Sequence, residues 1–344
     1  MKIGNRHIGP EHRPFIIAEI AQGHDGSLGN AMAFIEAAKA CGADAIKFQT
    51  HIASEESTRT EPWRVPFSKQ DVTRYGYWER TGFSLEQWRL LKKHADDVGI
   101  VFMSSPFSIL ACQWLQELGV PAWKLASGEV HNKELVDWVS ATDKPIILSS
   151  GLSSVDETLT LALELKRRGN EIAVLHCTTS YPTPPSEVGL NVMSHFLSEL
   201  DVPVGLSDHS GSSYPGTVAA YLGASIIEVH LAWHEKMFGP DTSSSLTPEG
   251  LKALRNGVDF AYQMRVGNVD KDEQLQRLAK ERSIFRRSIV ASQAISAGTL
   301  IEEHHLSYKK PGGGMSFEQR NQLIGKRTRS SVEPDHIFKV EDVE

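Results

Sequence analysis

The 344-residue chain has few cysteines, no block of basic residues and no long hydrophobic run. Cys41, Cys112 and Cys177 are odd in number and far apart, which argues against a disulfide framework and indicates a reducing compartment. The net charge of −7 is spread along the chain, so we do not expect nucleic acid as a partner. No segment approaches a membrane span, and the first residues lack the apolar stretch of a signal peptide. We therefore expect a cytoplasmic globular protein without a membrane partner.

What the chain does contain is a regular alternation of short apolar strands and helices. It begins with a strand at 15–20, and its last helix covers about 248–265. Eight strand–helix pairs in about 260 residues suit a closed barrel better than an open doubly wound sheet. No G-x-G-x-x-G follows the first strand, which argues against a dinucleotide-binding fold. The predicted fold class is α/β, a (β/α)8 TIM barrel.

The composition changes after the barrel. Residues 1–268 form the predicted catalytic barrel, and 269–285 are charged and poor in large apolar residues, as in a linker or connecting helix. Residues 286–344 contain short β-like pieces separated by turns, which predicts a small β-rich domain.

A polar stretch from His51 to Thr81 interrupts the early alternation. It carries Trp63, Tyr75 and Trp78, which makes it too aromatic for a disordered linker. Two interpretations stay open: a loop or lid over a site, or a packed surface excursion.

Polar residues follow almost every predicted strand. In a barrel of this kind the carboxyl ends of the strands carry the chemistry. The residues at or just beyond these ends are Glu19, Lys47, Gln49, Ser105, Lys124, Ser127, Glu129, Ser149, Thr179, Tyr181, Ser207, His209, Glu228 and His230.

These residue types leave more than one chemistry open. Lys47 and Lys124 among hydroxyl groups suit the binding of a phosphate and a carboxylate, although a lysine could instead form a Schiff base in an aldolase. His209 and His230, on neighbouring parallel strands, suit one divalent metal ion, but each could be a structural histidine. His24 is a further candidate ligand, with a hydrogen-bonding role as the alternative.

The order of the motifs resembles that of N-acetylneuraminate (sialic acid) synthases, a family that includes legionaminic and pseudaminic acid synthases. The resemblance covers nearly the whole chain, and the tail resembles the antifreeze-like (SAF) domain of that family. The motifs that carry it are Ala18-Glu-Ile with His24-Asp-Gly26, Ile46-Lys-Phe-Gln49, Ser104-Ser-Pro-Phe107, Lys124-Leu-Ala-Ser-Gly-Glu129, Ile147-Leu-Ser-Ser-Gly151, His176-Cys-Thr-Thr-Ser-Tyr-Pro-Thr-Pro184, Gly205-Leu-Ser-Asp-His209 and Gly239-Pro-Asp241.

This resemblance implies a metal-dependent condensation of phosphoenolpyruvate with an open-chain amino sugar such as N-acetylmannosamine, giving a nonulosonic acid and phosphate. It implies that His209 and His230 hold Mn2+, with Mg2+ or Co2+ as alternatives. Glu19 would lie between the substrates, and Glu129 and Glu228 would be available to handle protons. The implied phosphoenolpyruvate contacts are Lys47, Ser105, Lys124, Ser127, Ser149 and Ser207, and the implied sugar contacts are Gln49, Tyr181 and Asp241.

Two departures from the family pattern affect these expectations. Thr179 stands where Asn is common, so a phosphoenolpyruvate contact is rearranged. Lys310 replaces an Arg that reaches the sugar's acyl group from the tail domain of a partner subunit, and Lys cannot make the same planar contact. We expect a domain-swapped homodimer. We also keep open a related synthase acting on a diacetamido, phosphorylated or non-acylated hexose, and a Schiff-base aldolase.

Overall fold

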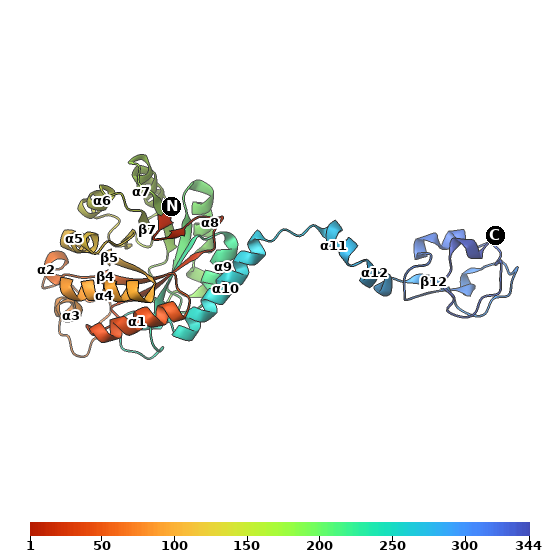
Figure 1. Cartoon of the computed structure of the whole chain (residues 1–344), viewed down its shortest axis with the longest axis horizontal. Helices are drawn as coiled ribbons and strands as arrows, with labels where there is room; N and C mark the ends of the chain where they lie inside the picture. Colours follow the sequence, from red (N-terminus) through yellow and green to blue (C-terminus); the bar gives the residue numbers. More distant parts are fainter. The chain divides into compact units, whose positions relative to one another are not determined.

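The computed structural model describes all 344 residues as two compact units, Met1–Val266 and Gly267–Glu344 (Figure 1). The first unit is built on eight parallel strands in the order β5-β4-β3-β10-β9-β8-β7-β6. The last strand, β6, has only three residues, and it lies beside β5 without ladder hydrogen bonds, so the barrel is nearly closed. The predicted (β/α)8 barrel is confirmed. Its strands are β3 (Phe15–Ala21), β4 (Ala45–Thr50), β5 (Val101–Pro106), β6 (Trp123–Leu125), β7 (Ile146–Ser149), β8 (Ile172–Cys177), β9 (Val204–Asp208) and β10 (Ile226–Leu231).

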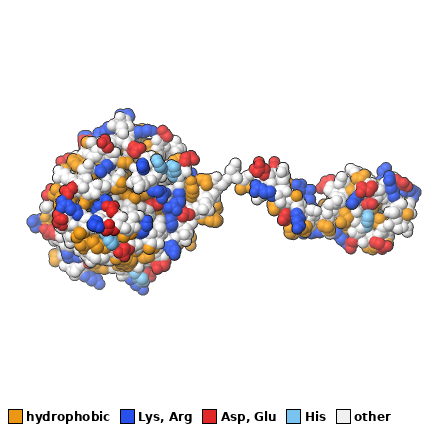
Figure 2. All heavy atoms as spheres, in the orientation of Figure 1, with side chains coloured by type: hydrophobic (Ala, Val, Ile, Leu, Met, Phe, Trp, Pro, Cys, Tyr) orange, Lys and Arg blue, Asp and Glu red, His pale blue; other side chains and the backbone are white.

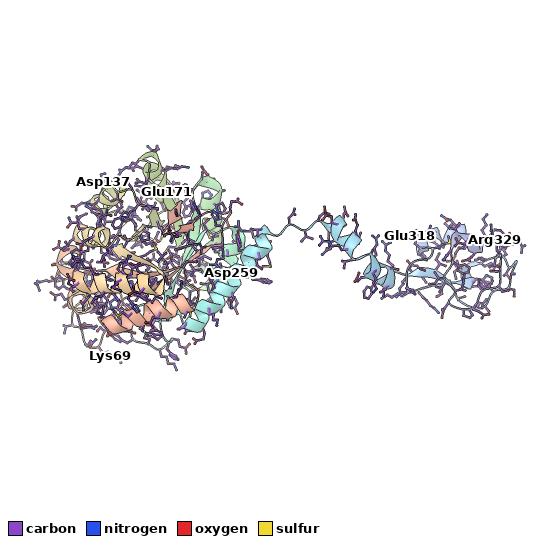
Figure 3. The ribbon with its side chains drawn as sticks, in the orientation of Figure 1. Lys69, Asp137, Glu171, Asp259, Glu318 and Arg329 are labelled. Atoms are coloured by element: carbon purple, nitrogen blue, oxygen red, sulfur yellow. The ribbon has the colours of Figure 1, made fainter.

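Helices surround the strands and mark their boundaries with local signals. Ser84 and Gln87 form a capping box that starts α4, and the left-handed Gly99 ends that helix. Polar side chains cover the outer surface of the layer; Asp137 on α6, for example, accepts from Arg168 at 2.8 Å (Figure 3). No helix is both long and apolar enough to cross a membrane. The covering helices are α1 (Leu28–Ala40), α4 (Leu85–Val98), α5 (Ile109–Glu117), α6 (Lys133–Ser140), α7 (Val155–Arg167), α8 (Leu190–Glu199), α9 (Tyr214–Leu222) and α10 (Pro248–Val266).

The strands are buried on both faces, because alternate side chains point to different cores. Ile16 and Ala18 of β3 pack outward with helix residues such as Phe34. Phe15 and Ile17 of the same strand pack inside the barrel. This alternation leaves the polar residues at the strand ends directed toward one mouth.

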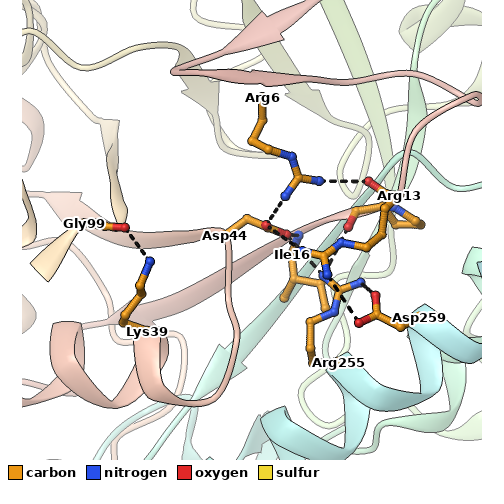
Figure 4. Close-up of polar contacts among 9 residues, drawn as sticks. Arg6, Arg13, Ile16, Lys39, Asp44, Gly99, Arg255 and Asp259 are labelled. Carbon is orange, nitrogen blue, oxygen red and sulfur yellow. Dashed lines mark hydrogen bonds and ion pairs between the residues drawn. The ribbon is translucent and has the colours of Figure 1, made fainter.

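An ion-pair network lies at the opposite, amino-terminal end of the strands (Figure 4). Asp44, just before β4, accepts from Arg255 of α10 at 3.2 Å and from the backbone N–H of Ile16 at 2.9 Å. Arg6 and Arg13 contact the same carboxylate. Since this end of a barrel serves stability, we assign the network a structural role.

Short elements complete the first unit. They are β1 (Lys2–Ile3), β2 (Arg6–His7), α2 (Ala53–Glu56), α3 (Arg74–Thr81), β11 (Ser245–Leu246) and two 3-10 turns at Pro185–Glu187 and Thr242–Ser244. Figure 2 shows acidic and basic side chains interspersed on the face in view, in keeping with the small net charge.

The second unit starts with α11 (Lys271–Arg277) and α12 (Ala279–Phe285), which occupy the predicted linker. Its only regular strands are β12 (Ser288–Ala291) and β13 (Leu306–Lys309), which pair antiparallel. Isolated bridges such as Ile295 with Val332 hold the other extended pieces, and 3-10 turns cover Glu303–His305, Phe317–Gln322 and Val340–Asp342. A small core that includes Ile301, Leu323 and Phe338 holds this unit together.

Candidate active site

A cavity of about 240 Å³ opens at the carboxyl ends of the barrel strands. It collects side chains from all eight barrel strands, β3 to β10, and from the segments that follow several of them. The predicted site residues that line it are Glu19, Lys47, Gln49, Ser105, Lys124, Ser127, Ser149, Thr179, Tyr181, Ser207, His209, Glu228, His230 and Asp241. The structure therefore brings together residues that are as far apart as 19 and 241 in the sequence.

Two buried lysines share one carboxylate at the base of the cavity. Glu228 Oε1 lies 3.5 Å from Lys47 Nζ and 3.4 Å from Lys124 Nζ. Although burial acts to raise it, the two lysines lower the pKa of Glu228 to about 2, so this group is ionised at neutral pH. Ser207 Oγ donates to the same oxygen at 3.2 Å, and Glu19 contacts Lys47 directly. These contacts hold both ammonium groups in place.

Burial acts on the pKa of Lys47 in the opposite direction from the pKa of Glu228, because it disfavours the charged form of each group. It lowers the pKa of Lys47 to about 7, against the attraction of Glu228 and in the same direction as the repulsion from Lys124. Ser105 Oγ lies 3.4 Å from Lys47 Nζ, and Ser149 Oγ accepts from Lys124 Nζ at 2.7 Å. Each lysine thus has a hydroxyl group beside it, an arrangement that suits an anion with several oxygen atoms.

Ser127 and Thr179 converge on the backbone at Gly151. The Gly151 N–H donates to Ser127 Oγ at 3.1 Å. A Cβ on Gly151 would lie 2.4 Å from Thr179 Oγ1 and 2.7 Å from Ser127 Oγ, so glycine is required for this close approach. Cys177 Sγ would lie 2.8 Å from the same Cβ, and it belongs to the cavity lining as well. This corner offers two hydroxyl groups near the lysines.

The two predicted metal-binding histidines lie next to each other in the cavity lining. Their ring centroids are 5.2 Å apart, and both are buried. His209 Nδ1 donates to the Thr178 carbonyl at 2.9 Å, which leaves Nε2 as the acceptor, 3.1 Å from the Tyr181 hydroxyl. Burial and the neighbouring His230 lower the pKa of His209 to about 3, and burial also lowers the pKa of His230. Both are therefore neutral imidazoles, the form that binds metal ions.

These histidines fit a divalent metal ion as two of its ligands. His209 has an unprotonated Nε2, which accepts from the Tyr181 hydroxyl, and its other nitrogen is oriented by a carbonyl group, as is typical of metal-binding histidines. No group of three or more His, Cys, Asp and Glu side chains is arranged to hold an ion. The remaining ligands would have to be substrate or water oxygens, which leaves positions open for chemistry.

His24 lies outside this pair. It is buried, its Nδ1 accepts from the Gly26 N–H at 3.1 Å, and its ring stacks on Phe83 at 4.4 Å. Of the two roles left open for His24, the hydrogen-bonding role is the one that its position supports.

The aromatic segment 51–81 both packs on itself and lines the cavity. Tyr75, Tyr77 and Trp78 form a small buried cluster with Trp63 and Phe67 against it. Trp63, Tyr77 and Trp78 also belong to the cavity wall. The two interpretations of this segment are thus both partly correct, because the packing of its helix α3 presents the aromatic rings to the mouth.

Arg64 of this segment is a cavity residue that the sequence did not reveal. Its guanidinium donates to Asp241 Oδ1 at 2.6 Å and lies 4.3 Å from the centre of the Tyr181 ring. A single arginine within a polar loop has no periodicity or strand-end position to mark it. Only the fold shows that it reaches two of the three predicted sugar contacts, Tyr181 and Asp241.

Two predicted site residues do not line the cavity. Glu129 lies in the turn after β6, where its N–H donates to the Ala126 carbonyl and its Oε2 accepts from Asn132 at 3.0 Å. Glu129 thus contacts the residue that caps α6, and its predicted role in handling protons stays a prediction. Lys310 belongs to the second unit, with its ammonium 5.3 Å from the Phe285 ring centre.

Comparisons with known proteins agree with this geometry. The NeuB family profile matches residues 34–271, more than half of the chain, and the SAF domain profile matches residues 286–344. The chain belongs to the NeuB family. Its tail is a SAF domain, as predicted.

Named relatives span almost the whole chain. The N-acetylneuraminate-9-phosphate synthase of Homo sapiens is 32% identical over 98% of this chain and 95% of its own length. The N,N'-diacetyllegionaminic acid synthase of Campylobacter jejuni is 30% identical over 95% of this chain and 99% of its own length. The crystal structure of the sialic acid synthetase of Leptospira borgpetersenii superposes with a TM-score of 0.72 at 27% identity, covering 82% of this chain and 95% of that one. The relatives named here are synthases that make different sugar acids.

Proposed function

We propose that this NeuB-family protein condenses phosphoenolpyruvate with an open-chain amino sugar of the N-acetylmannosamine type to give a nonulosonic acid and phosphate. The observation that carries the proposal is one cavity in which two buried, hydroxyl-flanked lysines lie beside a pair of neutral histidines. Family membership supports this reaction class, and the cavity would offer a place for each substrate.

The lysine side of the cavity would bind phosphoenolpyruvate. Lys47 and Lys124 supply positive charge, and Ser105, Ser127 and Ser149 supply directional donors for phosphate and carboxylate oxygens. Because Glu19 and Glu228 already balance the lysines, the anion must compete with these carboxylates for them.

Other residues of the lining would bind the sugar. These are Tyr181, Asp241 and Gln49, and Arg64 contacts the first two. His209 and His230 would hold a divalent metal ion, which we propose to be Mn2+, and when bound this ion acts as a Lewis acid. Binding both substrates in one cavity places the reacting carbons close together, which itself contributes to the rate.

The reaction balances without an outside oxidant or reductant. C3 of phosphoenolpyruvate forms a bond to the aldehyde carbon, whose oxygen gains a proton. Water adds to C2 and gives up a proton, and the bond between C2 and the phosphate oxygen then breaks to release phosphate and leave a ketone. Glu19 and Glu228 are the buried carboxylates near enough to Lys47 to influence where these protons go.

The identity of the acceptor sugar and the homodimer are parts of this proposal. A diacetamido, phosphorylated or non-acylated hexose stays an alternative acceptor. We propose that Lys310 serves the cavity of a second copy of the chain. Sedimentation analysis tests this point, since a fully active monomer would contradict it.

A Schiff-base aldolase is a second candidate because of one observation, the lowered pKa of Lys47. Borohydride reduction in the presence of substrate distinguishes the two functions. A covalent adduct on Lys47 would favour the aldolase, and the proposed condensation predicts none.

The experiment that tests the proposed function is phosphate release from phosphoenolpyruvate with Mn2+ across mannosamine-type and 2,4-diacetamido sugars. We expect release only with a matching sugar, and none in His209→Ala. Phosphate release that needs no sugar would contradict the proposal.

A further inference from the structure

One buried histidine of the cavity wall has no part in the reaction described above. His51 follows β4 and lies between the cavity residue Gln49 and the short helix α2. Its Nδ1 is 2.7 Å from Glu56 Oε1, and its Nε2 is 3.1 Å from Gln49 Oε1. Each ring nitrogen is therefore within hydrogen-bond distance of a side-chain oxygen atom.

Two aromatic rings fix the plane of this imidazole. The Trp78 ring stacks on one face at 3.9 Å with an interplanar angle of 16°, and Phe107 lies 4.2 Å away at 19°. The ring cannot tilt without losing these contacts, so the directions of its two nitrogens are set. Aromatic faces are also negative in their quadrupole, which favours a positively charged ring next to them.

The partners of His51 determine where its protons lie. An ionised carboxylate can only accept, so Nδ1 carries a proton toward Glu56. Gln49 Oε1 is an acceptor too, so Nε2 donates to it in this arrangement.

The Nε2 donor of His51 determines how Gln49 is turned. Nε2–H needs an acceptor, and the carbonyl oxygen is the only acceptor of the Gln49 side chain. The NH2 group of Gln49 is then left to face the cavity. A neutral His51 with a bare Nε2 would reverse this orientation and present the carbonyl oxygen instead.

We propose that Glu56 and His51 are positioning residues that turn the Gln49 carboxamide so that its NH2 group donates to an oxygen of the acceptor sugar. This inference rests on the proposed function. Glu56 Oε2 is buried without a hydrogen-bond partner, an arrangement that costs stability. A carboxylate kept there at such a cost is consistent with a role in orienting the His51 ring.

The first test needs no substrate and is therefore independent of the proposed function. The protein is labelled with 15N-histidine, and the His51 signals are identified by their loss in His51→Phe. We expect both nitrogens of His51 to be protonated at neutral pH in the wild type, and one to become bare in Glu56→Gln. A bare Nε2 in the wild type would overturn the proposal.

The second test is kinetic and compares Glu56→Gln with Glu55→Gln, an exposed neighbour on the same helix. In Glu56→Gln we expect KM for the sugar to rise about tenfold, with KM for phosphoenolpyruvate changed less than about twofold, as for the loss of one oriented hydrogen bond. Glu55→Gln should change neither constant. Equal rises in both KM values, or no rise in either, would contradict a positioning role. If Glu56→Gln fails to fold, the wild-type NMR spectrum still decides the proposal.

Discussion

Replacing Arg64 by Ala tests the division of the cavity into two halves. Arg64 contacts Asp241 and Tyr181 but none of the residues assigned to phosphoenolpyruvate. Without it, the two sugar contacts lose the group that holds them in place before the substrate arrives. The substitution should therefore weaken sugar binding alone.

The size of this effect follows from the exposure of the contacts. The ionic side chains of Arg64 and Asp241 are 41% and 17% exposed, so solvent screens the ion pair and limits it to about 0.5–1 kcal/mol. The cation–π contact with Tyr181 adds about 0.5–1 kcal/mol. A total of about 1–2 kcal/mol corresponds to a rise of about 5- to 30-fold in KM for the sugar.

Steady-state kinetics with each substrate varied in turn measures this effect. Arg59→Ala is the matched control, since Arg59 is an exposed arginine of the same segment that lies 5.0 Å from the Tyr75 ring and outside the cavity lining. We expect KM for phosphoenolpyruvate to stay within about twofold in both variants. A rise in KM for phosphoenolpyruvate that matches the rise for the sugar would refute the division.

Three further predictions follow from the same structure. Because the pKa of Lys47 is lowered to about 7, its positive charge is lost as pH rises through neutrality. Titration calorimetry should therefore show weaker binding of phosphoenolpyruvate at about pH 9 than at pH 6. In Lys47→Arg the affinity for phosphoenolpyruvate should not fall over this pH range. His209→Ala should abolish the rise in melting temperature that Mn2+ gives the wild type, while an undiminished rise would exclude His209 as a ligand. Gly205→Ala would place a Cβ 2.0 Å from the Ile226 carbonyl oxygen and should cost about 1–3 kcal/mol in denaturant unfolding, whereas Gly29→Ala meets no atom within 4 Å and should cost nothing.

Much of the fold could be predicted from the sequence because the barrel repeats one unit. Each short apolar strand is followed by a helix with its own start and stop signals, such as Ser84 and Gly99 around α4. The strand ends could then be located to within a few residues, and parallel pairing brings them to one mouth. This is why Lys47, Lys124 and Glu228 could be named as neighbours although they are far apart in the chain.

The rest of the site depends on side-chain directions that periodicity does not encode. Arg64 and His51 lie in irregular segments, and only tertiary packing brings them to the cavity wall. Glu129 is outside the cavity lining for a related reason. It follows a strand closely, but in the turn that begins at Ala126 its side chain contacts Asn132. Ser127 in the same turn does line the cavity, so position after a strand does not by itself fix where a side chain points.

The fate of the three carbons of phosphoenolpyruvate tests the central claim most directly. The protein would be incubated with Mn2+, an accepted hexose-derived sugar and phosphoenolpyruvate labelled with 13C at C3, and the products followed by NMR and mass spectrometry. The account predicts that the label appears in a sugar acid, bonded to the former aldehyde carbon, with one phosphate released for each product molecule. Labelled pyruvate with phosphate, and no label joined to the sugar, would contradict it.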